Sequence, residues 1–293
     1  MWLKTLHFAV SCCTGQRTEE TTEYNYSALS DLLEVVNRVF TECNQVLQSE
    51  KGQEWILVVE DFEKLGVEAE SLRHLFFDYR LLFEQLRCHL LFVIPVGLAY
   101  TEEAEKMPFG PQRQFMIPDI PVYKKKEYEP DEKGVGALID VIYRRIERAL
   151  LDETLARSLA IASGGNLRDL FDLLGRAGIA AEARQAARIE RPDALEAVQA
   201  LRSSYRFRLG ESDYGGPDSI AIQTKTEKLA AVYRGEPGAQ IPDKTLYVLL
   251  RQRMVLQYNG NVWFGVHPVV VDVLKETESL KPDEPGGTDL RGD

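Results

Sequence analysis

The first hundred residues alternate between helical and strand-like patterns of hydrophobic positions. Apolar side chains recur at helical spacing over 29–47, and again over 72–86. Two short apolar runs without alternation lie at 55–59 and 90–94, each after one of these helical patterns. Such runs are typical of strands that are buried on both faces of a parallel sheet. We therefore predict an α/β arrangement, with residues 115–122 as a candidate third strand that Pro118 and Pro121 break.

Beyond residue 133 the pattern becomes helical. Helices are expected at 134–150, 152–162, 166–177, 179–189, 191–207, 218–234 and 243–253. Asn259-Gly260 then lies between β-branched and aromatic residues, which is a strong hairpin signal, and Pro268 opens a last helix. The patterns divide the chain into an α/β part (1–125), a helical part (126–190), a helical and hairpin part (191–276) and a flexible tail (277–293).

The composition is that of a globular protein, and its charge narrows the range of partners. Hydrophobic residues make up 44% of the chain, charged residues 28%, and the net charge is −11. Nucleic acid and anionic membranes repel so acidic a chain as a whole. Binding to either of them would therefore require a local basic patch on the protein. No stretch approaches the roughly 20 apolar residues that cross a membrane, and the four cysteines show no metal-ligand spacing. We expect a cytoplasmic protein.

Two acids, Glu60 and Asp61, follow directly on the first predicted strand. They would project from the carboxyl edge of the sheet, where open α/β folds bind ligands. One carboxylate there can hold Mg²⁺ through water, and the other can orient or deprotonate a water aimed at a terminal phosphate. The alternative is a strand that simply ends in solvated acids.

The segment WILVVEDFEKL (55–65) resembles the Walker B motif of AAA+ and STAND P-loop ATPases. The resemblance gives Glu60 the metal role and Asp61 the water-activating role. The order departs from the usual Asp-then-Glu, so a longer side chain stands where a shorter one is usual. The resemblance covers roughly residues 27–275 and implies ATP and Mg²⁺ as cofactors.

The segment SGGNLRDL (163–170) resembles the sensor 2 region of the helical lid in the same family. A helix ends there, two glycines let the backbone turn, and a new helix begins with an arginine near its start. By this resemblance Arg168 faces the terminal phosphates of the nucleotide, a task that suits a guanidinium, and Asn166 caps the helix beside the nucleotide. The alternative is a glycine turn in which Arg168 pairs with Asp172 on the surface.

The family's phosphate loop, G-x-x-x-x-G-K-[ST], does not occur in the sequence. In the family this loop precedes the helix predicted at 29–47, so it would lie upstream of Met1. Two explanations stay open: the chain is a truncated or wrongly started form of a longer ATPase, or it kept the fold and lost hydrolysis. In both cases we expect weak or absent ATPase activity, because the loop and its Mg²⁺ supply most of the stabilisation of phosphoryl transfer.

The segment 218–275 resembles a winged helix-turn-helix module. Lys244, Arg251 and Arg253 lie on or beside its second helix and are candidates for contacts with DNA phosphates. Three cations are few for so acidic a chain, and the alternative is a module that packs or contacts protein. Trp263, Phe264 and His267 are expected in the core of the hairpin.

The sequence thus predicts an α/β protein in which a partial P-loop NTPase parallel sheet is followed by a helical lid and a winged-helix-like module. The function hypothesis is an ATP-dependent nucleotide switch, inactive or truncated as it stands, with a protein partner or self-association and no membrane contact. The alternative is a non-catalytic interaction or DNA-binding protein that acts through the terminal module.

Overall fold

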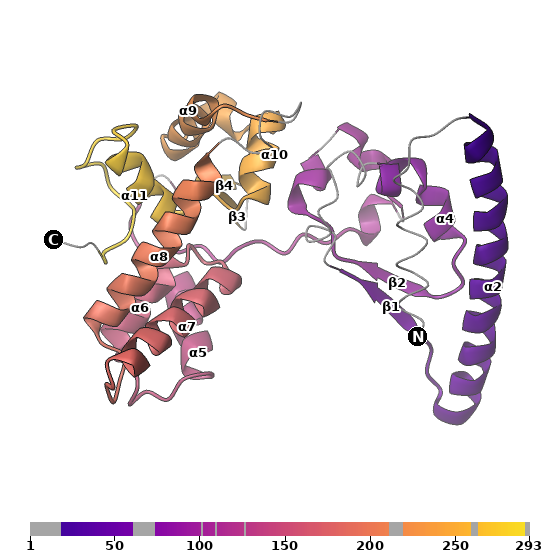
Figure 1. Cartoon of the computed structure of the whole chain (residues 1–293), viewed down its shortest axis with the longest axis horizontal. Coiled ribbons are helices and arrows are strands. Elements are labelled where there is room, and N and C mark those ends of the chain that lie inside the picture. The colour runs from indigo at the N-terminus through magenta and orange to yellow at the C-terminus, as the bar shows by residue number, and fades with distance from the viewer. Residues whose placement is uncertain are drawn as a thin grey trace. The chain divides into compact units, whose positions relative to one another are not determined.

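The chain forms two compact units, Met1–Phe115 and Met116–Asp293 (Figure 1). The computed structural model describes residues 19–60, 74–100, 102–108, 110–125, 127–210, 219–258 and 263–290. Over these ranges the fold is mostly helical and holds two small sheets, one parallel and one antiparallel. Within the described ranges no helix has both the length and the apolar character needed to span a bilayer.

The first unit combines a long helix with a two-stranded sheet. Its elements in chain order are α2 (Glu19–Lys51), β1 (Ile56–Val59), the π-helical turn η3 (His74–Asp78), α4 (Arg80–Glu84), β2 (His89–Phe92), and the 3₁₀ turns η4 (Val96–Tyr100), η5 (Glu102–Lys106) and η6 (Pro111–Arg113). Strands β1 and β2 are parallel, with Ile56 opposite His89 and Val59 opposite Phe92. The predicted parallel pairing is therefore confirmed.

The third predicted strand, at 115–122, is absent from the described structure. Asp119 forms only an isolated bridge with Tyr258. Pro118 and Pro121 explain the difference, because a proline has no backbone N–H to donate to a sheet.

The two faces of the β1–β2 sheet differ in burial. On one face Val59 and Phe92 pack against a cluster centred on Phe76 and Phe77. On the other face four apolar side chains remain about half exposed: Ile56 (58%), Val58 (49%), Leu91 (49%) and Val93 (48%). The prediction that both faces are buried is therefore wrong for these residues. Apolar runs without alternation indicate only that both faces are apolar, and burial depends on what packs there.

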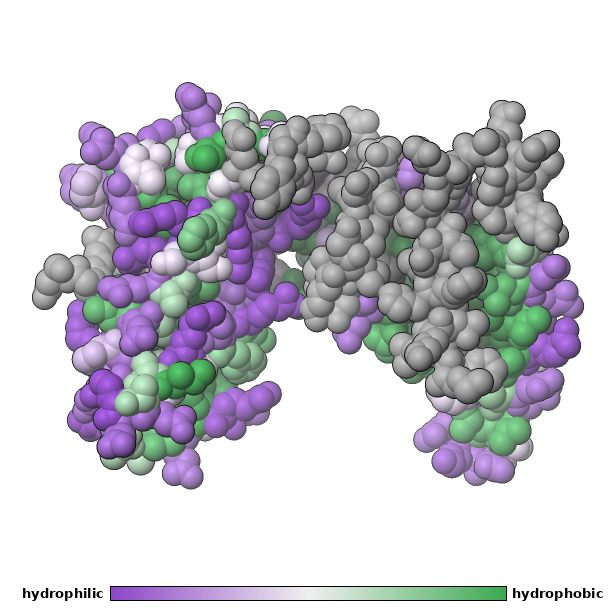
Figure 2. Space-filling model, in the orientation of Figure 1, coloured by the Kyte–Doolittle hydropathy of each residue, from purple (hydrophilic) through white to green (hydrophobic). Residues whose placement is uncertain are grey.

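Two asparagines hold α2 to the rest of the first unit. The Asn37 amide donates to the Gln85 carbonyl (2.9 Å), and its oxygen accepts from the Arg87 backbone N–H (2.7 Å). The Asn44 side chain accepts from the backbone N–H of Trp55 just before β1 (2.9 Å). Figure 2 shows hydrophilic residues along the outer side of this helix and hydrophobic surface on its inner side.

In its described residues the second unit is helical apart from one hairpin. Its elements are α5 (Glu132–Tyr143), α6 (Glu153–Ala162), α7 (Leu167–Ala183), α8 (Arg191–Leu209), α9 (Ile222–Tyr233), the 3₁₀ turn η8 (Pro237–Gln240), α10 (Lys244–Arg251), β3 (Val255–Tyr258), β4 (Trp263–Val266) and α11 (Pro268–Glu276). The predicted antiparallel hairpin forms, with Val255 opposite Val266. Its Asn259-Gly260 turn lies outside the described residues.

The helices predicted at 166–177 and 179–189 are a single helix, α7. Gly178 does not interrupt it, because one glycine lowers helix propensity by only about 1 kcal/mol. The predicted domain boundary between residues 190 and 191 lies between α7 and α8, which pack against each other. Arg184, the C-cap of α7, makes a forked contact with Asp193 of α8, with both distances 2.8 Å.

The chain after α11 is tied to the second unit. Asp272 accepts hydrogen bonds from the backbone N–H and the hydroxyl of Thr288, and Tyr233 donates to the carbonyl of Pro285. Leu280 and Leu290 are 2% and 0% exposed. The segment predicted as a flexible tail (277–293) is thus held to the second unit at Leu280, Thr288 and Leu290, while residues 281–283 are exposed.

Candidate functional site

The site residues predicted from the sequence fall in both units. Glu60 follows β1 directly and is exposed, at the carboxyl end of the parallel pair. Asp61 lies outside the described residues. Asn166 and Arg168 begin α7 in the second unit. Each group is therefore described within its own unit.

The Gly164–Gly165 turn is shaped by close packing of its backbone. Both glycines have positive φ, +65° and +88°, which side-chain-bearing residues rarely adopt. A Cβ on Gly165 would lie 1.6 Å from the Ile120 carbonyl oxygen, and one on Gly164 would lie 2.7 Å from the Leu256 side chain. The glycines thus let the chain at Ile120 and strand β3 lie against this turn.

Asn166 is the N-cap of α7, as predicted. Its side-chain oxygen accepts from the backbone N–H groups of Arg168 (3.1 Å) and Asp169 (3.2 Å), and its amide donates to Asp119 (3.0 Å). Burial raises the pKa of Asp119, although the bond from Asn166 opposes this rise. All the polar atoms of the Asn166 side chain are therefore engaged within the protein.

Arg168 lies on the first turn of α7 and is exposed. Its position is fixed by the Asn166 cap, which sets the first turn of the helix. The carboxylate of Asp172 is bound by Arg176 at 2.8 Å. Arg168 therefore lies on an exposed first turn of α7, three residues after the second glycine.

The turn is bonded to the hairpin module. The Tyr258 hydroxyl at the end of β3 donates to the Gly164 carbonyl (2.9 Å), and His267 before α11 contacts the Ser163 carbonyl through Nε2 (3.0 Å). All four residues are buried. A displacement of the turn would therefore change the hydrogen bonds that it makes with the hairpin and with the start of α11.

Asp169 is the centre of a buried polar cluster. Its carboxylate accepts from the hydroxyl of Tyr205 and from Arg253 (3.0 Å), and it lies 3.4 Å from His267 Nε2. Burial alone would raise the pKa of Asp169, but these partners outweigh it and lower the pKa to about 2. The same cluster, through burial first and then the Asp169 charge, raises the pKa of the Tyr205 hydroxyl.

The tautomer of His267 follows from its two contacts. Nδ1 accepts from the backbone N–H of Val269 (3.2 Å), so this nitrogen carries no proton. The proton is on Nε2, which faces the Ser163 carbonyl and the Asp169 carboxylate. His267 is 0% exposed and the Phe264 side chain 4%, which confirms both as core residues, whereas Trp263 is only partly buried.

The three basic residues proposed for DNA contact separate into two groups. Lys244 and Arg251, at the two ends of α10, are exposed. Arg253 instead turns inward and pairs with Asp169, which leaves it 25% exposed. Its φ of +59° directs the chain back toward the core after α10. The candidate basic surface of α10 therefore rests on Lys244 and Arg251.

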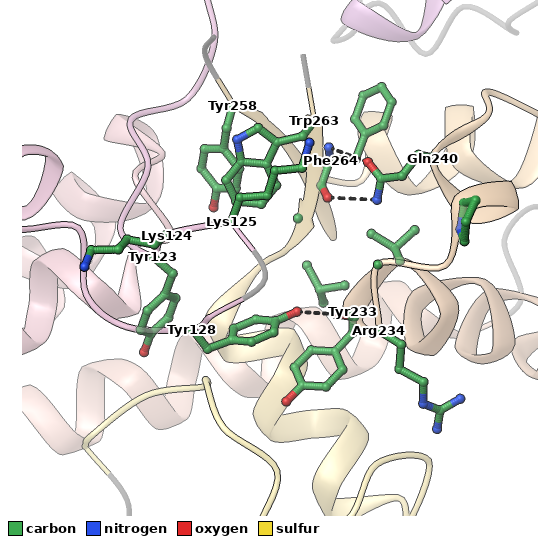
Figure 3. Close-up of a pocket in the computed structure, with 15 residues that line it drawn as sticks. Tyr123, Lys124, Lys125, Tyr128, Tyr233, Arg234, Gln240, Tyr258, Trp263 and Phe264 are labelled. Atoms are coloured by element: carbon green, nitrogen blue, oxygen red, sulfur yellow. Dashed lines mark hydrogen bonds between the residues drawn. The ribbon is translucent and has the colours of Figure 1, made fainter. Parts of the chain in front are cut away.

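A cavity of about 380 Å³ lies in the second unit, between the hairpin and the segment that precedes α5 (Figure 3). Two aromatic pairs line it: Tyr258 with Trp263, whose ring centroids are 4.6 Å apart, and Tyr128 with Tyr233, stacked at 4.5 Å. Gly265 makes room for the first pair, since a Cβ there would lie 2.8 Å from the Tyr258 ring.

Polar contacts fix both sides of this cavity. The Gln240 side chain makes two hydrogen bonds with the backbone of Phe264, at 3.0 and 3.2 Å. It thereby pairs the backbone N–H and carbonyl of Phe264 on the side of β4 that faces away from β3. The Tyr128 hydroxyl donates to the Tyr233 carbonyl (2.6 Å). Tyr128 has a φ of +53°, an unusual value for a tyrosine, and these contacts hold it there.

Sequence reasoning missed both the Asp169 cluster and this cavity. Tyr205, Arg253 and His267 approach Asp169 from distant parts of the chain, and no local spacing marks them. For the cavity a signal existed: Tyr123, Tyr128, Tyr233, Tyr258 and Trp263 are spaced far apart but are all aromatic residues beside loops or turns. Their convergence became visible only with the fold.

No group of three His, Cys, Asp or Glu side chains placed to bind a metal occurs among the described residues. No family model matches the chain, and no curated protein or solved structure matches it either.

Proposed function

We propose that the chain is the part of an AAA+/STAND-type P-loop ATPase that follows the phosphate loop, and that it works as a nucleotide-dependent switch. The observation that carries the proposal is the parallel β1–β2 pair with Glu60 directly after β1. Ligands of open α/β sheets bind at this carboxyl edge. Arg168, which follows a Gly-Gly turn and the Asn166 cap on the first turn of α7, would correspond to the lid arginine of such ATPases.

The half-exposed apolar face of the sheet also supports the proposal. Two-stranded sheets are marginally stable alone, and parallel sheets are normally covered on both faces. Ile56, Val58 and Leu91 would be covered if further strands and helices completed the sheet. We propose that the phosphate loop belongs to that missing portion.

The residues fit Mg-ATP in their chemistry. Glu60 is an exposed residue whose carboxylate is a ligand type that Mg²⁺ accepts directly or through water, and a guanidinium such as that of Arg168 suits phosphate oxygens. When bound, Mg²⁺ supplies charge neutralisation at the phosphates. Asp61 would hold and deprotonate the attacking water. Asn166, whose side chain is engaged within the protein, would act by positioning Arg168.

The contacts of the Gly-Gly turn suggest how a switch would be transmitted. Movement of Arg168 toward phosphates would pull on residues 163–166, which are bonded to Tyr258 and His267. These two residues belong to the hairpin and to the start of α11. Nucleotide binding would thereby reorient the winged-helix-like module, and we propose that this module carries the output.

The test compares the chain with a form extended by its upstream coding sequence. ATP hydrolysis is measured as phosphate release for the extended form and its Asp61→Asn, Glu60→Gln and Arg168→Ala variants. We expect Asp61→Asn to lower kcat at least about 100-fold while ATP still binds, because the loss concerns the attacking water. Arg144→Ala, an exposed arginine at the end of α5, serves as the control and should leave kcat unchanged.

A second function, a non-catalytic interaction protein, is favoured by the same apolar sheet face, which would suit a protein partner. DNA is the weaker choice of partner because Arg253 is bound to Asp169. An upstream sequence without a phosphate loop, together with no ATP binding in calorimetry, would decide for this second function.

A further inference from the structure

The aromatic cavity of the second unit has the composition of a ligand site. Its volume of about 380 Å³ lies within the range of about 300–1,000 Å³ that is usual for small-molecule sites. In Figure 3 the Tyr258 and Trp263 rings lie above the cavity and the Tyr128 and Tyr233 rings below it. Two aromatic pairs among the lining residues offer ring surface that suits a flat aromatic group.

The charged residues that line the cavity favour a ligand with negative charge. Of the fifteen described residues that line it, none is acidic and three are cationic: Lys124, Lys125 and Arg234. Aromatic cages also bind organic cations, but cationic lining residues would repel such a ligand. Figure 3 shows the side chains of Lys124 and Arg234 extending outward from the aromatic part of the site.

The three cations differ in how far they are already paired. Lys124 is bound to Glu129 at 3.0 Å, whereas Arg234 is 3.9 Å from Glu236 and thus more weakly paired. All three residues are exposed. Lys125 and Arg234 are therefore the lining cations that these ion pairs engage least, and so the better candidates for contact with an anionic group.

The tyrosines remain uncharged at neutral pH. Burial, and then the Glu284 charge, raises the pKa of Tyr233 to about 12, and burial likewise raises the pKa of Tyr128 and of Tyr258. The rings thus add apolar stacking surface and no negative charge that would oppose an anion.

From this geometry we propose that the cavity between the Tyr258–Trp263 and Tyr128–Tyr233 pairs binds a mononucleotide-sized aromatic anion, with its ring against these pairs and its phosphate at Lys125 and Arg234. The volume holds one base, not a strand. The site is independent of the ATPase proposal, because it uses neither Glu60 nor Arg168.

Tryptophan fluorescence provides a direct test. The full chain with Trp2→Phe and Trp55→Phe keeps Trp263 as its only tryptophan. Titration with AMP should quench Trp263 fluorescence to saturation, with adenosine binding about fivefold more weakly, since each exposed ion pair contributes little. Inorganic phosphate alone should cause no quenching.

Charge variants separate the anion contact from the stacking. The double change Lys125→Ala with Arg234→Ala should weaken AMP about fivefold and leave adenosine unchanged. The matched control, Arg144→Ala with Arg188→Ala, removes two exposed arginines that do not line the cavity and should change neither affinity. Thermal melting of both double variants checks that the fold is retained.

Four outcomes would overturn the proposal. The first is no quenching at millimolar AMP. The second is that the two double variants weaken AMP binding equally. The third is loss of AMP binding on Glu60→Gln or Arg168→Ala, because the nucleotide would then bind at the proposed ATPase site. The fourth is tighter binding of a thymidine decanucleotide than of AMP, which would make the site a strand-binding surface.

Discussion

The hydroxyl of Tyr258 donates a hydrogen bond of 2.9 Å to the carbonyl oxygen of Gly164, 94 residues earlier in the chain. Both groups are buried, so neither can exchange this partner for water. The bond joins the hairpin to the turn that precedes Arg168. It is therefore one direct route, beside the His267–Ser163 contact, by which an event at that turn would reach the hairpin.

Tyr258→Phe removes this bond and keeps the ring. We expect the free energy of unfolding of the second unit to fall by roughly 1–3 kcal/mol, because the Gly164 carbonyl is left buried without its donor. Urea unfolding followed by Trp263 fluorescence measures the change. An unchanged midpoint would mean that water reaches the Gly164 carbonyl and that the hairpin and turn are not coupled through it.

Gly165→Ala tests the close packing of the turn. The new methyl group would meet the Ile120 carbonyl oxygen at 1.6 Å, and the φ of +88° would add strain. We expect destabilisation of about 3 kcal/mol or more, measured by thermal melting. Gly175→Ala is the matched control, since this exposed glycine of α7 has open space around it, and it should stabilise by about 0.5–1 kcal/mol.

The sequence contained enough to predict the local elements of the site. Two apolar runs separated by a helical pattern predict a parallel pair, and β1 and β2 form one. The Asn166 cap follows from an asparagine placed after a glycine turn and before an apolar helical pattern, and Asn-Gly marks the hairpin. Each of these signals is contained within a few neighbouring residues.

What could not be predicted depends on distant partners. The half-exposed face of Ile56 and Leu91 has the same apolar composition as the buried face, so the pattern alone cannot separate them. Arg253 looks like a helix-end cation available to DNA until Asp169, 84 residues earlier, is placed beside it. Gly178 suggests a break in a helix that packing against α8 keeps continuous.

Asp169 should make the stability of the second unit depend on pH in the acid range. Its pKa falls from the ordinary value of 3.8 to about 2 on folding. Because the pKa is lower in the folded state, the ionised carboxylate stabilises the folded protein above pH 4. This contribution to the free energy of unfolding is lost as pH falls from about 4 to 2. The loss amounts to roughly 2 kcal/mol.

The measurement for Asp169 is the free energy of unfolding as a function of pH, in the wild type and in Asp169→Asn. The variant should be less stable at pH 7, because Arg253 loses its charged partner. It should also show a smaller decline between pH 4 and pH 2. Parallel pH profiles of the two proteins would show that other carboxylates govern acid unfolding.

The segment after α11 should contribute to stability although its sequence is rich in Pro, Gly and Asp. A chain ending at Pro282 loses the burial of Leu290 and leaves Asp272 without Thr288. We expect the free energy of unfolding to drop by roughly 3 kcal/mol, with a lower Tm. A chain ending at Leu290 keeps all these contacts, so its Tm should match the full chain, and equal Tm values for all three would show a dispensable tail.

The two faces of the β1–β2 sheet should respond differently to truncation. Phe92 packs edge-on against Phe76 and Phe83, with ring centroids 5.8 and 4.9 Å away, so Phe92→Ala should destabilise the first unit by about 3 kcal/mol. Leu91→Ala, on the half-exposed face, should change it by less than about 1 kcal/mol. Trp55 fluorescence during urea unfolding reports on this unit.

The same face links stability to the proposed function. Further strands and helices would cover Leu91 in a longer protein if the proposal holds. Leu91→Asp should then leave the free energy of unfolding of the present chain nearly unchanged. In the upstream-extended form it should lower both ATP hydrolysis and Tm, because the new charge would be buried there. Leu81→Asp, an exposed position on α4, is the matched control. Equal tolerance of both substitutions in the extended form would mean that the β1–β2 sheet stays uncovered, which would remove the support that the apolar face gives to the ATPase proposal.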